Sequence, residues 1–281
     1  EKVVHIPRLL YFFCSHANSV AMDINLKTYP IEAGKSKVHD FLASKGIETT
    51  VESSPAFPTI YRITYKIEGE PKVSIIIPNK DNYAVLKKCV DSITEKSSYK
   101  NYEIIIADNQ STQKQVLEYY EELKQNGNVT ICFYDKPFNY SAINNYAVSF
   151  ASGDYLILLN NDTEVITENW IEEMLMFAQR SDVGAVGAKL LYPNNTVQHG
   201  GIILGLGDHH TAGHAHCGAE EDNLGYMGKL FYAQDVSAVT AACLMVKKTD
   251  YLAVGGFDEQ LAVAYNDVDF CLKLRQKNLL N

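Results

Sequence analysis

The chain has 281 residues, of which 46% are hydrophobic and 21% are charged, and this composition is ordinary for a globular protein. Its length allows one sizeable core and a smaller appendage. The net charge of −9 argues against a general nucleic-acid binder, because such proteins neutralise phosphates with clustered Lys and Arg. An anionic ligand would therefore need local help from a metal ion or a helix N-terminus.

The six cysteines are widely scattered and include no CxxC pair, which predicts reduced and mostly buried thiols of a cytosolic protein. They are Cys14, Cys89, Cys132, Cys217, Cys243 and Cys271. No apolar run approaches the roughly 20 residues needed to span a bilayer. We expect a cytoplasmic protein, with peripheral association at the inner face of the membrane as a second location.

Strand and helix patterns alternate from about residue 72 onward. Expected strands lie at 72–78, 102–109, 128–134, 154–162, 183–192 and 241–248, and expected helices at 82–98, 112–127, 140–153, 168–180 and 267–277. Such alternation predicts an α/β fold with a mostly parallel central sheet that has helices on both faces. The first 70 residues differ, because one helix at 29–46 and one half-buried strand at 59–67 indicate a small α+β extension.

Polar residues follow the expected strands at the ends where a parallel sheet binds its ligands. They are Pro78-Asn79-Lys80-Asp81, Asp108-Asn109-Gln110-Ser111 and Asn160-Asn161-Asp162. Neither GxGxxG nor GxxxxGK[ST] occurs after a strand, which argues against a dehydrogenase or a P-loop enzyme. The site must therefore hold its ligand with carboxylates and amides.

Three acidic positions each allow two interpretations. Asp162, beside two Asn residues, could hold Mg²⁺ or Mn²⁺, or the triplet could cap the next helix. Asp108 could contact a base or ribose, or cap a helix. Asp267 could accept a proton from an attacking hydroxyl, or complement a helix dipole, a role that suits Asp269 better.

The order of five segments resembles the family 2 inverting glycosyltransferases with the GT-A fold, especially bacterial enzymes of surface-polysaccharide and O-antigen assembly. The segments are "PKVSIIIPNKD", "YEIIIADNQS", "GDYLILLNNDTEV", "TAACLMVKKTDYLAVGGFDE" and "NDVDFCLKLRQK". The resemblance runs from about Pro71 to the end of the chain. It implies transfer of a sugar from a nucleotide-diphosphate sugar to a saccharide or lipid-linked saccharide acceptor.

The resemblance also assigns roles to single residues. Nucleotide-sugar contacts fall on Pro78, Asn79, Asp81, Asp108, Asn160 and Asn161. The DxD-type motif of the family falls on 160–162, so Asp162 would hold a divalent cation, Mn²⁺ or Mg²⁺, on the diphosphate. Asp267 would be the catalytic base. Candidates for the acceptor site or a lid are His199, His214, His216, Asp258 and Asn266.

Two positions depart from the family pattern. Asn160 stands where the motif begins with Asp, and Asn266 stands where the family has Glu. Both changes weaken the local negative charge. They leave open an alternative, a catalytically silent nucleotide-sugar or carbohydrate-binding module of a larger transferase.

The N-terminal segment "VVHIPRLLYFFCSHANSVA" is similar to the tail that closes such transferase domains. We therefore expect residues 1–70 to be the tail of a preceding module with a linker, and residues 71–281 to be a C-terminally truncated transferase domain. On this interpretation His16 belongs to the site of the preceding module, and further modules of a longer polypeptide are partners.

The stretch 205–218, "GLGDHHTAGHAHCG", holds His209, His210, His214, His216 and Cys217. These spacings suggest a zinc site, but they lie in a glycine-rich loop rather than on the helix that an HExxH site uses. We expect adventitious metal or none there, and a lid or acceptor loop instead.

Overall fold

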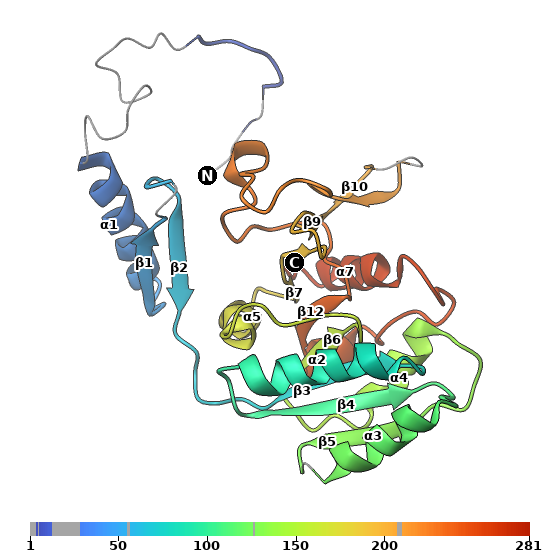
Figure 1. The fold of residues 1–281 in the computed structure, drawn as a ribbon. Helices are drawn as coiled ribbons and strands as arrows, with labels where there is room; N and C mark the ends of the chain where they lie inside the picture. Colours follow the sequence, from blue (N-terminus) through green and yellow to red (C-terminus); the bar gives the residue numbers. More distant parts are fainter. Residues whose placement is uncertain (1–3, 5, 13–28, 55–56, 126, 207–209) are drawn as a thin grey trace. The chain divides into compact units, whose positions relative to one another are not determined.

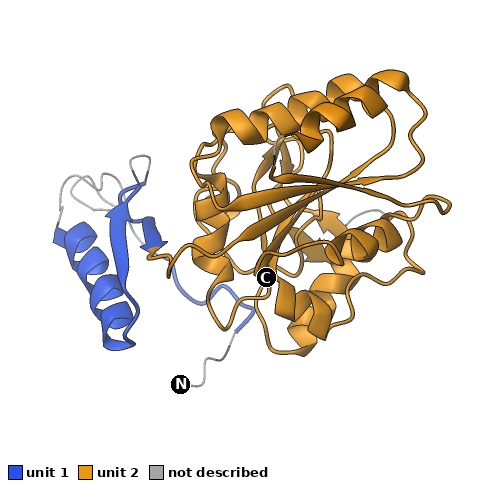
Figure 2. Ribbon diagram, turned by 90° about the horizontal axis from the view of Figure 1, so that it is seen from below, with its two compact units in different colours: residues 1–64 blue, residues 65–281 orange. Residues whose placement is uncertain are grey.

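A computed structural model describes the chain except residues 1–3, 5, 13–28, 55–56, 126 and 207–209. Cys14, His16 and His209 lie outside the described residues. The chain divides into two compact units, residues 1–64 and 65–281 (Figure 2). The sequence placed this boundary six residues later, between residues 70 and 71. None of the helices in the described part of the chain is long and apolar enough to cross a bilayer.

The N-terminal unit contains α1 (Tyr29–Ser44) and a two-stranded sheet of β1 (Thr49–Ser53) and β2 (Tyr61–Tyr65). The hydroxyl of Tyr61 donates a hydrogen bond to the carbonyl of Ile31 in α1 (3.0 Å). A Cβ at Gly34 would meet that hydroxyl, so a larger residue there would displace the Tyr61 side chain. The sequence predicted α1 and β2, but it missed β1.

The second unit is built on a six-stranded sheet with the order β5-β4-β3-β6-β12-β7 (Figure 1). Its strands are β3 (Val73–Asn79), β4 (Tyr102–Asp108), β5 (Val129–Phe133), β6 (Tyr155–Leu159), β7 (Ala185–Gly187) and β12 (Cys243–Lys247). β3 is parallel to β4 and β6, and β4 is parallel to β5. β12 runs antiparallel to both β6 and β7. The predicted mostly parallel sheet is confirmed, with β12 as the reversed strand.

Helices cover both faces of this sheet, as predicted (Figure 2). They are α2 (Tyr83–Lys96), α3 (Lys114–Lys124), α4 (Tyr140–Val148), α5 (Trp170–Ala178), α6 (Lys248–Ala253) and α7 (Asn266–Gln276). Successive side chains of a strand point to opposite faces. Ile75 and Ile77 accordingly pack with α2, α3 and α5, whereas Ile76 packs with α4 and α7. Burial on both faces explains why these strands are continuous apolar runs.

A long insert of short strands separates β7 from β12. It contains β8 (Leu190–Leu191), β9 (Val197–His199), β10 (Ile202–Leu204), β11 (Ala212–His214) and the 3₁₀ turn η2 (Tyr226–Gly228). The expected strand at 183–192 is therefore wrong as one element, because it splits into β7 and β8. β8 pairs with β9 and β10 with β11, both antiparallel. Strands of two or three residues are too short to produce a periodic signal in the sequence.

The four cysteines within the core, Cys89, Cys132, Cys243 and Cys271, are buried free thiols, and Cys217 is an exposed free thiol. Burial raises the pKa of Cys89 to about 11 and that of Cys271 to about 12. The predicted burial is confirmed for four of the five described cysteines.

Glu103 joins three segments at the end of the sheet where β3 begins. It accepts hydrogen bonds from the Lys72 ammonium (2.7 Å), the Ser74 hydroxyl (2.6 Å) and the Ser152 amide (2.7 Å). Burial alone would raise its pKa, but these donors together lower it to about 2. The ionised form therefore stabilises the fold.

We expect Glu103→Gln to lower the free energy of unfolding at neutral pH by about 1–3 kcal/mol, because the ionised acceptor is lost. Glu118→Gln, which removes an exposed ion pair with Lys114, is the control and should change it by less than about 0.5 kcal/mol. The contribution of Glu103 is complete above its unfolded pKa of about 4.5 and is lost as the pH falls toward 2. Urea unfolding at several pH values measures this difference, and a pH-independent difference would contradict it.

Candidate active site

Residues that are far apart in the sequence meet at one edge of the central sheet. Asn79 and Asp108 are the last residues of β3 and β4, and they are direct partners in the ladder. Asn160 follows the end of β6. Because β12 is antiparallel to β6, its first residue, Cys243, pairs with Leu159. The segment before β12 therefore reaches the same edge as the carboxyl ends of the parallel strands.

A buried chain of hydrogen bonds connects three of these strand ends. Asn161 Nδ2 donates to Asn79 Oδ1 (2.6 Å), and Asn79 Nδ2 donates to the hydroxyl of Tyr120 in α3 (2.8 Å). The Tyr120 hydroxyl in turn donates to Asp108 Oδ1 (2.7 Å). Burial, and then the hydrogen bond to Asp108, raise the pKa of Tyr120. The chain holds the donor-site candidates Asn79, Asp108 and Asn161 in one fixed arrangement.

Asp108 lies in the floor of this edge rather than at its surface. Its side chain is only 2% exposed, and Oδ2 accepts the amide of Ser111 (3.0 Å) while Oδ1 is held by Tyr120. Asp108 does not cap α3, whose N-cap residue is Gln113, but closes the turn after β4 through Ser111. Its contact with a nucleotide stays a prediction. Tyr120 itself was missed by sequence reasoning, because a tyrosine on the apolar face of a helix is indistinguishable from ordinary core.

The loops after β3 and β4 are tied into a single rim. Pro78 lies within β3 opposite Ala107, and Asp81 follows in the left-handed region with a φ of 52°. Asp81 Oδ1 accepts the amides of Thr112 (2.7 Å) and Gln113 (2.9 Å). Hydrogen bonds from these two amides lower the pKa of Asp81. The predicted contacts Pro78, Asn79 and Asp81 therefore adjoin the loop of Asp108.

The triplet after β6 offers one free carboxylate. Asn160 Oδ1 accepts a hydrogen bond from the Tyr140 hydroxyl (3.3 Å), and the backbone N–H of Asn160 donates to the carbonyl of Ala242 (3.1 Å). Asp162 is exposed and forms no hydrogen bond or ion pair with the described residues. Carboxylate and amide oxygens suit Mg²⁺ or Mn²⁺. Among the described residues no three His, Cys, Asp or Glu side chains gather as a metal cluster, so a cation here would need oxygens from its ligand.

Asp267 lies in the first turn of α7 and faces the segment before β12. Its Oδ2 accepts the amide of Ala241 (3.2 Å), and its Oδ1 accepts the amide of Val268 (2.8 Å). Asn266 is 4% exposed, and its side chain forms two hydrogen bonds with the backbone. Its Oδ1 accepts the backbone amide of Asp267, and its Nδ2 donates to the carbonyl of Leu261. Asp269 instead pairs with Lys273 (2.8 Å).

Tyr140, the first residue of α4, bridges the residues after β6 and the segment before β12. Its hydroxyl contacts the carbonyl of Ala241 (3.1 Å) as well as Asn160. Burial raises the pKa of Tyr140, and the negative charges of Asp267 and Asp162 add to the effect. The hydroxyl of Tyr140 thus links the start of the triplet that contains Asp162 to the backbone that binds Asp267, and no local sequence signal indicated this link.

The remaining candidates lie in the insert and in the loop before α7. His199 is 1% exposed, and its Nδ1 is 2.9 Å from His214 Nδ1. His216 Nε2 accepts the amide of Tyr226 (3.0 Å), so His216 connects the residues after β11 to the start of η2. Asp258 Oδ1 accepts the amide of Gln260 (2.9 Å) and closes a turn. His214 and His216 therefore have separate partners, and the described part of the stretch 205–218 forms no cluster of three metal ligands.

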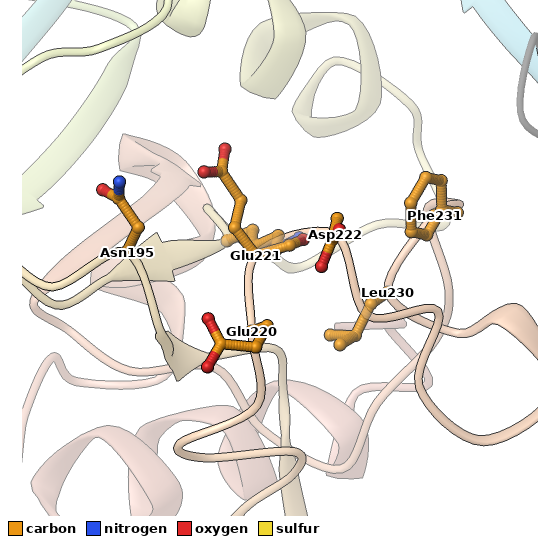
Figure 3. Close-up of a pocket in the computed structure, with 7 residues that line it drawn as sticks. Asn195, Glu220, Glu221, Asp222, Leu230 and Phe231 are labelled. Atoms are coloured by element: carbon orange, nitrogen blue, oxygen red, sulfur yellow. The ribbon is translucent and has the colours of Figure 1, made fainter.

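A cavity of about 590 Å³ lies in the insert and is lined by none of the predicted site residues (Figure 3). It is lined by Lys189, Asn195, Glu220, Glu221, Asp222, Leu230 and Phe231. Lys189 spans one side, since its ammonium donates to the carbonyl of Glu221 (2.9 Å) and lies 5.9 Å from the centre of the Phe231 ring. The sheet edge is a better candidate for the active site than this cavity, because the ends of parallel strands are where ligands bind in an α/β sheet.

Solved structures share this architecture. The chain is similar to the mannosyltransferase PcManGT from Pyrobaculum calidifontis in complex with GDP-Man and Mn²⁺, with a TM-score of 0.57 and 13% identity over 94% of this chain and 65% of that one. It is also similar to GalNAc-T7 with UDP, GalNAc and Mn²⁺, with a TM-score of 0.59 and 13% identity over 78% of this chain and 43% of that one. The fold is that of the GT-A glycosyltransferases, as predicted.

The sequence comparisons specify the family. Residues 74–213 match the model of glycosyl transferase family 2, and the protein carries a glycosyltransferase domain of this family. It is 41% identical to the uncharacterized protein y4gI of Sinorhizobium fredii over 98% of this chain. It is 38% identical to the O-antigen biosynthesis protein RfbC of Myxococcus xanthus over 88% of this chain. The chain spans 30% of the length of y4gI and 19% of that of RfbC.

Tyr120→Phe tests the buried chain of hydrogen bonds. We expect it to lower the free energy of unfolding by about 1–3 kcal/mol, because Asp108 Oδ1 and Asn79 Nδ2 lose a buried partner. Tyr119→Phe is a matched control on the same helix, since the Tyr119 hydroxyl is buried without a hydrogen-bond partner. Its removal should be neutral or stabilising. Urea unfolding measures both variants, and equal losses would show that the connection through Tyr120 contributes nothing.

Proposed function

We propose that this domain transfers a sugar from a nucleotide-diphosphate sugar to a hydroxyl of a saccharide acceptor, with inversion at the anomeric carbon, in the synthesis of cell-surface polysaccharide. The observation that carries this proposal is the Tyr140 hydroxyl at the carboxyl edge of a GT-A sheet, which joins Asn160, two residues before Asp162, to Ala241, whose amide donates to Asp267. Similarity to an O-antigen biosynthesis protein over 88% of the chain supports the class of product.

The donor would bind along the rim formed by Pro78, Asn79, Asp81, Asn160 and Asn161, with Asp108 supporting it from below. Asp162 is the proposed carboxylate ligand of a divalent cation, and its lack of a protein partner fits that role. A bound Mn²⁺ or Mg²⁺ would offset the charge of the leaving diphosphate. The Mn²⁺ and nucleotides named with the two solved structures support a metal-dependent, nucleotide-sugar donor.

Asp267 is the proposed general base. In a single displacement the acceptor hydroxyl attacks the anomeric carbon as it loses its proton, and the bond to the diphosphate breaks, so one carboxylate is enough. The hydrogen bonds from Ala241 and Val268 orient the side chain. The Asn266 side chain forms hydrogen bonds with the backbone of the same turn. We propose that four further residues shape the acceptor side, namely His199, His214, His216 and Asp258.

The partners are proposed on the same grounds. A saccharide acceptor, or a lipid-linked one, would bring a cytoplasmic domain to the inner face of the membrane. The acidic net charge of −9 disfavours nucleic acid. The greater length of y4gI and RfbC supports the proposal that the domain works beside further modules of one polypeptide, with residues 1–70 as the tail and linker of a neighbouring module.

Donor binding is tested by thermal stabilisation with UDP, dTDP, GDP and CMP, each with Mn²⁺, with Mg²⁺ or with a chelator. We expect one nucleotide to raise the melting temperature only with a divalent cation, because Asp162 would hold the cation that offsets the charge of the phosphates. Asp162→Ala should lose this shift. Asp40→Ala, which removes an exposed carboxylate in α1, should keep it. A shift with Zn²⁺ alone, and none with any nucleotide, would instead point to the His-rich stretch.

Asp267→Asn tests the base. We expect the variant to bind the nucleotide normally but to lose transfer by about 10²–10⁴-fold, because the amide cannot take up the proton. Asp269→Asn, on the same helix turn, should keep the activity. The measurement is release of the nucleotide from sugar conjugates of whichever nucleotide stabilises the protein in the thermal test, with added saccharide or water as acceptor. Undiminished transfer in Asp267→Asn would exclude this role, and binding without turnover in the unmodified protein would support a silent binding module.

A further inference from the structure

Two histidines from different strands of the insert meet next to the backbone segment that contacts the proposed base. His199 of β9 is buried, and its ring lies nearly perpendicular to that of His214 of β11, at an interplanar angle of 81° and a centroid separation of 5.1 Å. The two Nδ1 atoms are 2.9 Å apart. The other nitrogen of His199, Nε2, accepts the amide of Thr240 (3.4 Å). His199 therefore connects His214 to the segment that precedes β12.

These contacts define where each proton lies. A backbone amide can only donate, so His199 Nε2 must carry a lone pair. Burial, and then the neighbouring His214, lower the pKa of His199 to about 3, so the ring is neutral and its proton is on Nδ1. That proton points at His214 Nδ1, which must accept it. The arrangement disfavours the opposite tautomer of His199, because its Nε2–H would then face the N–H of Thr240.

The segment held by His199 also holds the proposed catalytic groups. The amide of Ala241, next to Thr240, donates to Asp267 Oδ2 (3.2 Å). The carbonyl of Ala241 accepts a hydrogen bond from the Tyr140 hydroxyl (3.1 Å), and the carbonyl of Ala242 accepts one from the backbone N–H of Asn160 (3.1 Å). A shift of Thr240 would therefore move the amide that orients Asp267.

We propose that His199 is a positioning residue for Asp267, acting through Thr240 and Ala241, and that His214 fixes the tautomer in which His199 can do so. This inference rests on the proposed role of Asp267. His199 touches no reacting atom. It supplies an acceptor for the Thr240 amide, and His214 supplies the acceptor that keeps the proton of His199 on the opposite side of the ring.

The tautomers can be observed in the unmodified protein. Nitrogen NMR of the chain carrying ¹⁵N-labelled histidine should show His199 protonated at Nδ1 and neutral throughout pH 6–8, with the signals assigned by His199→Gln and His214→Asn. Neutral His214 should carry its proton on Nε2. A His199 protonated at Nε2, or charged in this range, would overturn the proposal whether or not any variant folds.

Kinetics test the positioning role with paired variants. His199→Phe, which fills the space but offers no acceptor, should lower kcat for nucleoside-diphosphate release by about 10–100-fold without raising KM for the nucleotide sugar. His199→Gln, whose side-chain oxygen can replace Nε2, should recover much of this loss. His214→Asn, whose oxygen can replace Nδ1, should likewise retain more rate than His214→Leu. Equal losses in His214→Asn and His214→Leu would indicate direct substrate contact through Nε2 and overturn the tautomer role.

The two proposals fail in different ways. If the unmodified protein shows no metal-dependent nucleotide binding and no release, the proposed function fails. If it binds and releases nucleotide, but His199→Phe does so at the same rate, only the positioning role of His199 fails. Melting temperatures of the variants separate a loss of rate from a loss of folded protein.

Discussion

The reversal of β12 against β6 places the backbone of residues 240–242 at the edge where the parallel strands end. Because Cys243 pairs with Leu159, the residues just before β12 lie beside the residues just after β6. Their amides and carbonyls hold His199, Asp267, Tyr140 and Asn160. A parallel β12 would carry this segment to the other end of the sheet. The proximity of the two proposed catalytic carboxylates therefore depends on one antiparallel pairing.

The donor half of the edge depends on a second constraint, the burial of polar groups. Asp108, Asn79 and Tyr120 lie in the interior, where an unpaired polar group costs roughly 1–3 kcal/mol. Each has a partner, and the partners link β3, β4, α3 and the residues after β6. Such a network allows few alternative arrangements. The rim above it can thus be held in place before any ligand binds, which limits the cost of ordering on binding.

The two departures from the family pattern have a consistent physical consequence. Asn160 uses its side-chain oxygen to accept the Tyr140 hydroxyl, and Asn266 uses its side chain on the backbone of the turn that presents Asp267. A carboxylate at either position would add negative charge beside Asp162 or Asp267. With amides at both positions, Asp162 and Asp267 have no like charge from Asn160 or Asn266 beside them.

The sequence by itself determined the layered architecture and the candidate carboxylates. Continuous apolar strands separated by amphipathic helices are sufficient to predict a sheet covered on both faces, because burial depends on local patterns. Local patterns also identify the acids that lie next to strand ends or a helix start, namely Asp108, Asp162 and Asp267. Tertiary structure decided what each of them contacts. The direction of β12, the burial of Asp108 under Tyr120, and the pairing of His199 with His214 through strands of three residues all depend on contacts between distant segments, for which hydrophobic periodicity carries no signal.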